Sequence, residues 1–163
     1  MMPQSGKLRN MASIYLTRGS KILLLYRQGD SIVHNLWIGS AGGHFKSEEL
    51  NDATACVLRE LHEELGLRAD QIENLQLRYI TLRSTDDEIR QNYYYFAALK
   101  NTAPKVLPST EGNTQWFSLE ETDTLPMPFT ARYVMDHYIK TGRFNEQLYG
   151  GIANELGITF TSL

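Results

Sequence analysis

Short apolar segments separated by turn residues dominate the first part of the chain. The segments at 11–18 (MASIYLTR) and 21–28 (KILLLYRQ) are rich in apolar and β-branched residues, and Gly19-Ser20 separates them. This pattern predicts two strands joined as a hairpin or meander. The ten residues before them are expected to form a loose end. The segment at 36–43 (LWIGSAGG) predicts a short strand that runs into a glycine-rich turn.

A helical period replaces the strand pattern after residue 50. Asp52 is a favourable N-cap, and Gly66 lies where a left-handed residue commonly ends a helix. The apolar positions between them recur at helical spacing: Val57, Leu58, Leu61 and Leu65. We therefore expect a helix from about Asp52 to Leu65.

The second half of the chain predicts three further strands and one further helix. The segments at 72–83 (IENLQLRYITLR) and 88–100 (EIRQNYYYFAALK) flank four polar residues, so they are expected to pair as an antiparallel hairpin. A short strand is expected at 114–121 (TQWFSLEE), and 129–142 (FTARYVMDHYIKTG) has the period of an amphipathic helix. The tail at 143–163 shows no clear pattern.

The order of these elements predicts an α/β fold. Strands surround the first helix and precede the second, which favours a mixed sheet with helices on its faces. The chain of 163 residues contains no repeat, low-complexity tract or linker, and its length suits one compact unit. We therefore expect a single domain over 1–163, with a core at about 11–142 and a C-terminal tail at 143–163.

The amino-acid composition argues against some classes of binding partner. The 16 Lys and Arg against 19 Asp and Glu give a net charge of -3, which disfavours binding of a nucleic-acid polymer because that needs a basic surface. The single cysteine, Cys56, excludes an internal disulfide and fits a reducing compartment. No apolar run approaches the roughly 20 residues that span a bilayer. We expect a cytoplasmic protein that does not enter membranes.

Three glutamates on the first predicted helix indicate a metal site. Glu60, Glu63 and Glu64 fall within an arc of roughly 100° beside the apolar stripe, so they can converge at the edge of the core. Like charges at this spacing repel unless a cation lies between them. Oxygen ligands suit Mg²⁺ or Mn²⁺, which bridge carboxylates to substrate phosphates. The alternative is a solvated helix in which Arg59 pairs with Glu63.

The residues around these glutamates form a specific motif. The segment at 59–67 (RELHEELGL) resembles the second half of the Nudix box, R-E-U-x-E-E-x-G-U with U aliphatic, without a mismatch. Three further segments are also similar to that family: 16–27 (LTRGSKILLLYR), 37–43 (WIGSAGG) and 110–121 (TEGNTQWFSLEE). The resemblance covers about Met11 to Gly142.

The first half of the box departs from the family pattern. Gly43 and Glu49 have the expected interval, but Arg59 lies two residues too far along the chain. Counted back from Arg59, the box glutamate falls on Asn51. Glu49, Glu48 and Asn51 therefore remain alternatives for this position, which in the family orders the loop and contacts the arginine.

The resemblance implies an α/β/α sandwich that hydrolyses a nucleoside diphosphate linked to another moiety. Glu60, Glu63 and Glu64 would bind a divalent ion, Mg²⁺ or Mn²⁺, together with the backbone carbonyl of Gly43. The implied catalytic set is completed by Arg59, which would orient the glutamates, and by a general base. The candidates for that base are Glu63, Glu64 and Glu111.

The sequence signals for residues that contact the substrate are less specific than the motif for the metal site. Arg83 and Arg90 lie on the predicted hairpin and are candidates for contacts with phosphates, while Tyr95 and Phe129 are candidates for stacking on a base. The alternatives are structural arginines and core aromatics. The segment at 125–134 (LPMPFTARYV) resembles one near the base pocket of relatives that cleave nucleoside triphosphates.

That resemblance favours a (deoxy)nucleoside triphosphate, including an oxidised purine, as the small-molecule substrate. Two alternatives stay open: an ADP-ribose or sugar-nucleotide pyrophosphatase, and a non-catalytic module that senses a nucleotide. The sequence leaves the oligomeric state open, with a homodimer among the expected forms.

Overall fold

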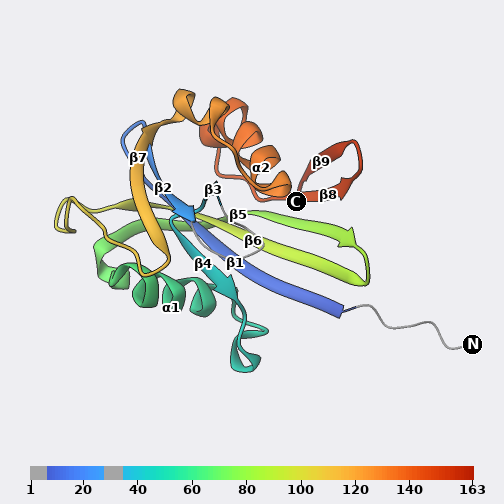
Figure 1. Ribbon diagram of the computed structural model, residues 1–163, viewed down its shortest axis with the longest axis horizontal. Helices are drawn as coiled ribbons and strands as arrows, with labels where there is room; N and C mark the ends of the chain where they lie inside the picture. Colours follow the sequence, from blue (N-terminus) through green and yellow to red (C-terminus); the bar gives the residue numbers. More distant parts are fainter. Residues whose placement is uncertain (1–6, 28–34) are drawn as a thin grey trace, which may run out of the picture.

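The structure, a computed structural model, describes residues 7–27 and 35–163. Its strands form one mixed sheet in the order β3-β2-β1-β6-β5-β8-β9, with β4 paired to β1 and β7 paired to β2 (Figure 1). The strands are β1 (Lys7–Arg18), β2 (Lys21–Arg27), β3 (Leu36–Ile38), β4 (Ala41–His44), β5 (Ile72–Thr85), β6 (Glu88–Leu99), β7 (Gly112–Ser118), β8 (Tyr149–Asn154) and β9 (Gly157–Ser162).

Within the described residues, two α-helices and four short 3-10 turns connect the strands. The α-helices are α1 (Ala53–Leu65) and α2 (Phe129–Lys140). The turns are η1 (Ser47–Glu49), η2 (Ala69–Gln71), η3 (Leu119–Thr124) and η4 (Gly142–Phe144). No helix in the described part of the chain is long and apolar enough to cross a membrane.

Strand β1 lies at the centre of the sheet. It runs parallel to β6 and antiparallel to both β2 and β4, so its two ends have different neighbours. Strand β6 pairs antiparallel with β5, and β8 then runs parallel to β5. The sheet is therefore mixed, as its sequence pattern predicts.

The two α-helices cover opposite faces of this sheet. Residues of α1 pack with Ala12, Ile14 and Leu16 in one core cluster. Residues of α2 pack with Tyr15 and Phe96 in a second cluster. Alternate residues of β1 thus point to different helices, as the period of two in a strand requires. This arrangement is the expected α/β/α sandwich.

Most of the expected elements are confirmed. The strand pairs β1–β2 and β5–β6 are antiparallel, and α1 begins after its N-cap Asp52 and ends at Gly66, whose φ is 68°. The helix α2 ends at Lys140, two residues before the predicted stop.

Four parts of the chain differ from the expectation. The glycine pair lies in strand β4 and not in a turn, and the strand expected at 114–121 ends at Ser118, where η3 follows. Residues 7–10 are not a loose end, because they pair with β6 as the start of β1, while 1–6 lie outside the described residues. The tail contains β8 and β9, which extend the sheet beyond β5. Its short, glycine-containing strands hid this hairpin from pattern analysis.

Candidate functional site

Two glycines of β4, the strand before the loop into α1, leave no room for a side chain. A Cβ at Gly42 would lie 2.6 Å from the carbonyl oxygen of Ala12, and a Cβ at Gly43 would lie 2.4 Å from Oε1 of Glu60. Any larger side chain at residue 43 would push the Glu60 carboxylate away. The glycine pair therefore brings the backbone of β4 against the acidic helix.

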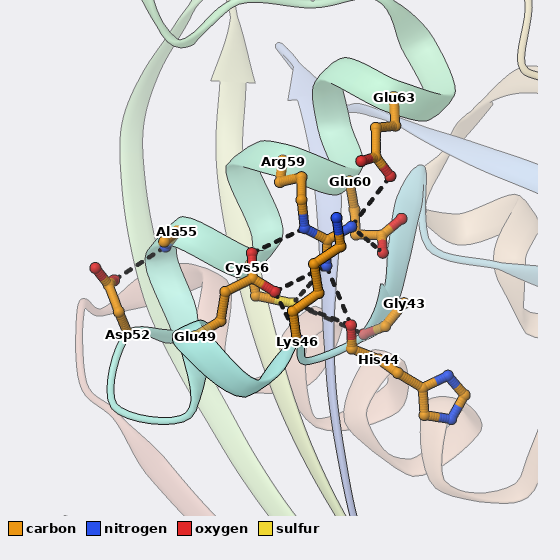
Figure 2. A network of polar contacts seen from close by, with 10 residues as sticks. All are labelled: Gly43, His44, Lys46, Glu49, Asp52, Ala55, Cys56, Arg59, Glu60 and Glu63. Carbon is orange, nitrogen blue, oxygen red and sulfur yellow. Dashed lines mark hydrogen bonds and ion pairs between the residues drawn. The ribbon is translucent and has the colours of Figure 1, made fainter.

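Arg59 is the centre of the polar network in this loop and helix (Figure 2). Its guanidinium donates to both oxygens of Glu49, at 2.8 and 2.9 Å. It also donates to Glu60 at 2.8 Å, to Glu63 at 3.1 Å and to the carbonyl of His44 at 3.1 Å. One cation thus faces three carboxylates and fixes the loop to the helix.

Glu49 occupies the position that the sequence left open among three residues. Its side chain is buried, and besides Arg59 it accepts a hydrogen bond from the backbone N–H of Lys46 at 2.8 Å. Hydrogen bonds from Arg59 lower the pKa of Glu49 to about 2. Glu48 and Asn51 are exposed. The 3-10 turn η1 compensates for the two additional residues by returning the Glu49 carboxylate to Arg59.

Glu64 differs from the other two helix glutamates because it does not contact Arg59. Its carboxylate accepts a hydrogen bond from the backbone N–H of Gly42 at 3.0 Å. Burial, with smaller contributions from the charges of Glu60 and Glu111, raises the pKa of Glu64 to about 7. In the protein without a cation, the Glu64 carboxyl group therefore changes between its protonated and ionised forms near neutral pH.

The loop before β7 brings Glu111 to the same place. The backbone N–H of Thr110 donates to the carbonyl of Glu64 at 3.1 Å, and the charge of Glu111 acts on the Glu64 carboxyl. Glu111 itself lies 3.7 Å from Arg27 at the end of β2. Sequence analysis did not select Arg27, because only the pairing of β2 with β7 places it beside this loop.

The donor atoms around α1 suit a hard divalent cation. The three helix carboxylates and the carbonyl of Gly43 offer oxygen atoms, which such a cation prefers as ligands, and Arg59 alone does not balance the charge of the carboxylates. No three His, Cys, Asp or Glu side chains in residues 7–27 and 35–163 already stand as a metal cage. The reason is visible in the contacts: Glu60 and Glu63 face Arg59, whereas Glu64 faces Gly42. Rotation of Glu60 and Glu63 is needed for all three to share a cation.

Two of the substrate candidates meet on the α2 side of the sheet. The guanidinium of Arg83 lies 4.5 Å from the ring centre of Phe129. Arg90 pairs in register with Arg83 and forms an ion pair with Glu88 at 3.2 Å. Glu88 also contacts Arg9 at 3.4 Å, a residue that sequence analysis missed because it lies in the supposed loose end.

Tyr95 is separated from these candidates. It is only 4% exposed in the core beneath α1, and its hydroxyl group pairs with Thr54 at 3.0 Å. Its strand position places it on the face opposite Arg90. We therefore remove Tyr95 from the set of substrate residues.

His44 links the two groups of residues. It follows Gly43 directly, and its ring is turned away from Arg59 in Figure 2 and contacts the guanidinium of Arg9. Burial and the charge of Arg9 lower the pKa of His44. The imidazole is therefore neutral at pH 7 and adds no charge to the arginines beside it.

Solved structures confirm the fold. An E. coli protein, ORF135, has a TM-score of 0.66 at 22% identity, over 88% of this chain and 98% of that one. A MutT protein from Bacillus halodurans has a TM-score of 0.65 at 17% identity, over 94% and 97%. A C. elegans Ap4A hydrolase has a TM-score of 0.65 at 16% identity, over 84% and 99%. No curated protein matches the sequence.

The family follows from the sequence together with this fold. The profile of the NUDIX domain matches residues 7–138, which include the strands, the glycine pair and α1. Members of this family generally need a divalent metal ion. The chain belongs to the Nudix family and is a pyrophosphohydrolase that acts on nucleoside diphosphate derivatives.

Proposed function

We propose that this enzyme hydrolyses a (deoxy)nucleoside triphosphate, an oxidised purine nucleotide included, to the monophosphate and pyrophosphate. The observation that carries the proposal is the approach of Glu60 to the Gly43 backbone and of Glu64 to the Gly42 N–H at the end of β4. These carboxylates can hold a cation that binds phosphate, and the next residue, His44, contacts the guanidinium of Arg9 on the other face of the sheet. The MutT-type structures that the chain resembles support the same choice.

Each residue of the loop and helix has a separate role in this proposal. Glu60, Glu63 and Glu64, with the carbonyl of Gly43, hold Mg²⁺ or Mn²⁺. The bound ion neutralises phosphate charge and lowers the pKa of a water molecule. Arg59 positions Glu60 and Glu63 and does not touch substrate, because its guanidinium is engaged by Glu49 and the carbonyl of His44.

The general base is one of three carboxylates: Glu63, Glu64 or Glu111. In the protein without a cation, burial raises the pKa of Glu64 to about 7, and a cation bound by Glu64 would favour its ionised form. Glu111 lies on the neighbouring loop, is more exposed, and is paired only with Arg27 across 3.7 Å. A Glu111→Gln variant distinguishes them, because loss of the base lowers kcat without lowering metal affinity.

Products from a nucleotide panel test the proposed reaction. The enzyme is incubated with nucleoside triphosphates, 8-oxo-purine triphosphates, ADP-ribose and sugar nucleotides, each with Mg²⁺ and each with EDTA. We expect monophosphate and pyrophosphate from triphosphates, only with the metal. Sugar phosphate plus nucleoside monophosphate would instead establish the ADP-ribose or sugar-nucleotide activity. Binding without cleavage of any compound would establish a sensing module.

Metal binding should depend on pH through Glu64. Since its pKa in the folded protein is raised to about 7, the apo protein loses stability from this group as pH rises from about 4.5 to 7. A cation needs the ionised form, so the apparent affinity for Mg²⁺ should fall about tenfold per pH unit below pH 7. Thermal shifts with and without Mg²⁺ at pH 5.5 to 8.5 measure this. An unchanged shift across that range would contradict the assignment of Glu64.

A further inference from the structure

The strand β9 has a free edge. It ends the strand order of the sheet, and among residues 7–27 and 35–163 it pairs with β8 alone (Figure 1). Its other edge therefore presents backbone donors and acceptors that can pair with a further strand. The hairpin of β8 and β9 lies outside the residues 7–138 that match the family domain. This edge is thus a candidate interaction surface outside that domain.

Alternate residues of β9 direct their backbone groups to the free edge. The N–H of Leu163 donates to the carbonyl of Leu148 at 2.8 Å, and these residues lie opposite each other next to the last register pair of the hairpin. They are therefore a hydrogen-bonded pair, and such pairs alternate along an antiparallel ladder. Residues 157, 159 and 161 accordingly bond to β8. The backbone groups that point to the free edge belong to Ile158, Phe160 and Ser162.

The edge lacks the features that commonly prevent pairing between strands. Charged side chains, proline and bulges protect most exposed edges. The segment at 157–162 (GITFTS) contains no charged residue and no proline, and its register with β8 is regular. The nearest charged residue along the chain, Glu155, lies in the turn before the strand. Strand β9 is therefore suited to pairing with another strand.

The ring of Phe160 holds this edge in place. A Cβ at Gly151 of β8 would lie 2.8 Å from Cε1 of Phe160, so the ring lies across the glycine. The ring centre is also 4.7 Å from that of His137 on α2 and 5.4 Å from that of Tyr79 on β5. Because the strand is ordered by these contacts, its pairing with a partner costs little additional conformational entropy.

Two copies of β9 are complementary to each other about Phe160. When Phe160 lies opposite Phe160 of a second, antiparallel copy, Ile158 lies opposite Ser162 of that copy. All the residues that point to the free edge then form hydrogen-bonded pairs. Thr159 lies opposite Thr161 of the second copy, which is a favourable cross-strand pair. The same residues serve both copies, as a two-fold axis requires.

Two exposed leucines flank β9 and fit the same arrangement. Leu156, in the turn before the strand, is 92% exposed, and Leu163, directly after it, is 71% exposed. In the pairing about Phe160, Leu163 lies opposite Gly157 of the second copy, the neighbour of Leu156. Each end of the paired strands thus brings two of these leucines together and removes apolar surface from water. A second copy of the chain accounts for both leucines.

We propose that two copies of this chain pair through β9, antiparallel about a two-fold axis at Phe160, and so join their sheets into one. The partner of this edge is a second copy because the edge is complementary to itself in hydrogen bonding and in side chains. The proposal does not depend on the proposed function, because β8, β5 and β6 lie between β9 and the strand β1 that pairs with the glycine pair.

Sedimentation equilibrium with charge variants tests the pairing and its register. The unmodified protein should have twice the mass of the 18.6 kDa chain at micromolar and higher concentration. Thr159 and Thr161 are exposed, so both can be replaced without disturbing the core. Thr159→Lys with Thr161→Lys places like charges opposite each other at both symmetric positions, and it should weaken the dimer about tenfold or more. Thr159→Glu with Thr161→Glu should do the same.

The matched control has opposite charges at the same two positions. Thr159→Glu with Thr161→Lys places a carboxylate opposite an ammonium group in the dimer, so this variant should associate at least as tightly as the unmodified protein. Circular dichroism and thermal unfolding verify that all three variants are folded. A monomer at every concentration, assembly beyond two copies, or equal dissociation constants for the three variants would overturn the proposal.

Amide hydrogen exchange gives a readout for each residue. In the dimer the N–H groups of Ile158, Phe160 and Ser162 should exchange slowly. In the dissociated lysine variant they should exchange rapidly, while the N–H groups of residues 159 and 161 stay protected by β8. Rapid exchange of the first three groups in an unmodified dimer would place its interface elsewhere and overturn the pairing through β9.

Discussion

Glu60→Gln and Glu64→Gln should each lower kcat by about a thousandfold or more while the protein stays folded. Both changes keep the size of the side chain and remove the charge that a divalent cation needs. Glu60 lies against Gly43, and Glu64 accepts from the N–H of Gly42, so neither carboxylate holds the core together. Steady-state rates at saturating Mg²⁺, with circular dichroism and thermal unfolding, measure both parts of this expectation.

Stability gives the Glu64 variant a second readout. Because burial disfavours the ionised carboxylate, Glu64→Gln should be at least as stable as the unmodified protein in EDTA at pH 8. Glu120→Gln is the matched control, because the Glu120 side chain is 70% exposed and forms a long ion pair with Arg143, at 3.9 Å. A folded double variant with near-normal turnover would contradict the metal assignment.

The sequence predicts those parts of the fold that local rules determine. The helix α1 has a favourable N-cap, a periodic apolar stripe and a left-handed glycine at its end, and it begins and ends as expected. The β5–β6 hairpin is similarly marked by its polar turn. The C-terminal hairpin lacks such signals. Gly150 and Gly151 interrupt the apolar pattern of the sequence in β8, and the strand forms because it pairs with β5. Tertiary pairing, not propensity, creates this element.

In the candidate site, too, some residues are predicted from local sequence and others come together only through tertiary pairing. The glutamates of α1 follow from one continuous motif, so sequence alone brings them together. Arg9, Arg90 and Arg83 come from three strands, and Arg9 belongs to a segment with no pattern of its own. These arginines become neighbours only through strand register, which a single sequence does not specify. Tyr95 was misplaced for another reason. The alternation of residues along a strand predicts that they point to two faces of the sheet, but it does not predict which face is open to substrate, and Tyr95 lies on the buried one.

Glu49 was ambiguous for a different reason. Spacing alone favoured Asn51 when counted from Arg59 and favoured Glu49 when counted from Gly43. The structure distinguishes them by burial and charge, since Glu49 is 5% exposed and paired with Arg59, whereas Asn51 is exposed. A buried carboxylate requires a partner, and Arg59 provides it.

Arg59→Gln should therefore be the most destabilising single change in this site. It leaves the buried Glu49 carboxylate without a cationic partner and with the neutral backbone N–H of Lys46 as its remaining hydrogen-bond donor. Breaking a buried ion pair in this way costs about 3 kcal/mol in the free energy of unfolding. Turnover should fall as well, because Glu60 and Glu63 lose the group that positions them. Urea denaturation at pH 7 and steady-state rates measure the two effects.

A double-mutant cycle and acid titration identify the Glu49 pair as the cause. Since the pKa of Glu49 is lowered to about 2, the stability that this pair provides is present above about pH 4.5 and is lost as pH falls towards 2. Arg59→Gln should flatten that acid dependence, and Glu49→Gln should flatten it equally. In the double variant the losses should be smaller than their sum, because a buried charge no longer lacks its partner. Glu48→Gln, an exposed change in the same turn, should match the unmodified protein, and additive losses would show that Glu49 and Arg59 act independently.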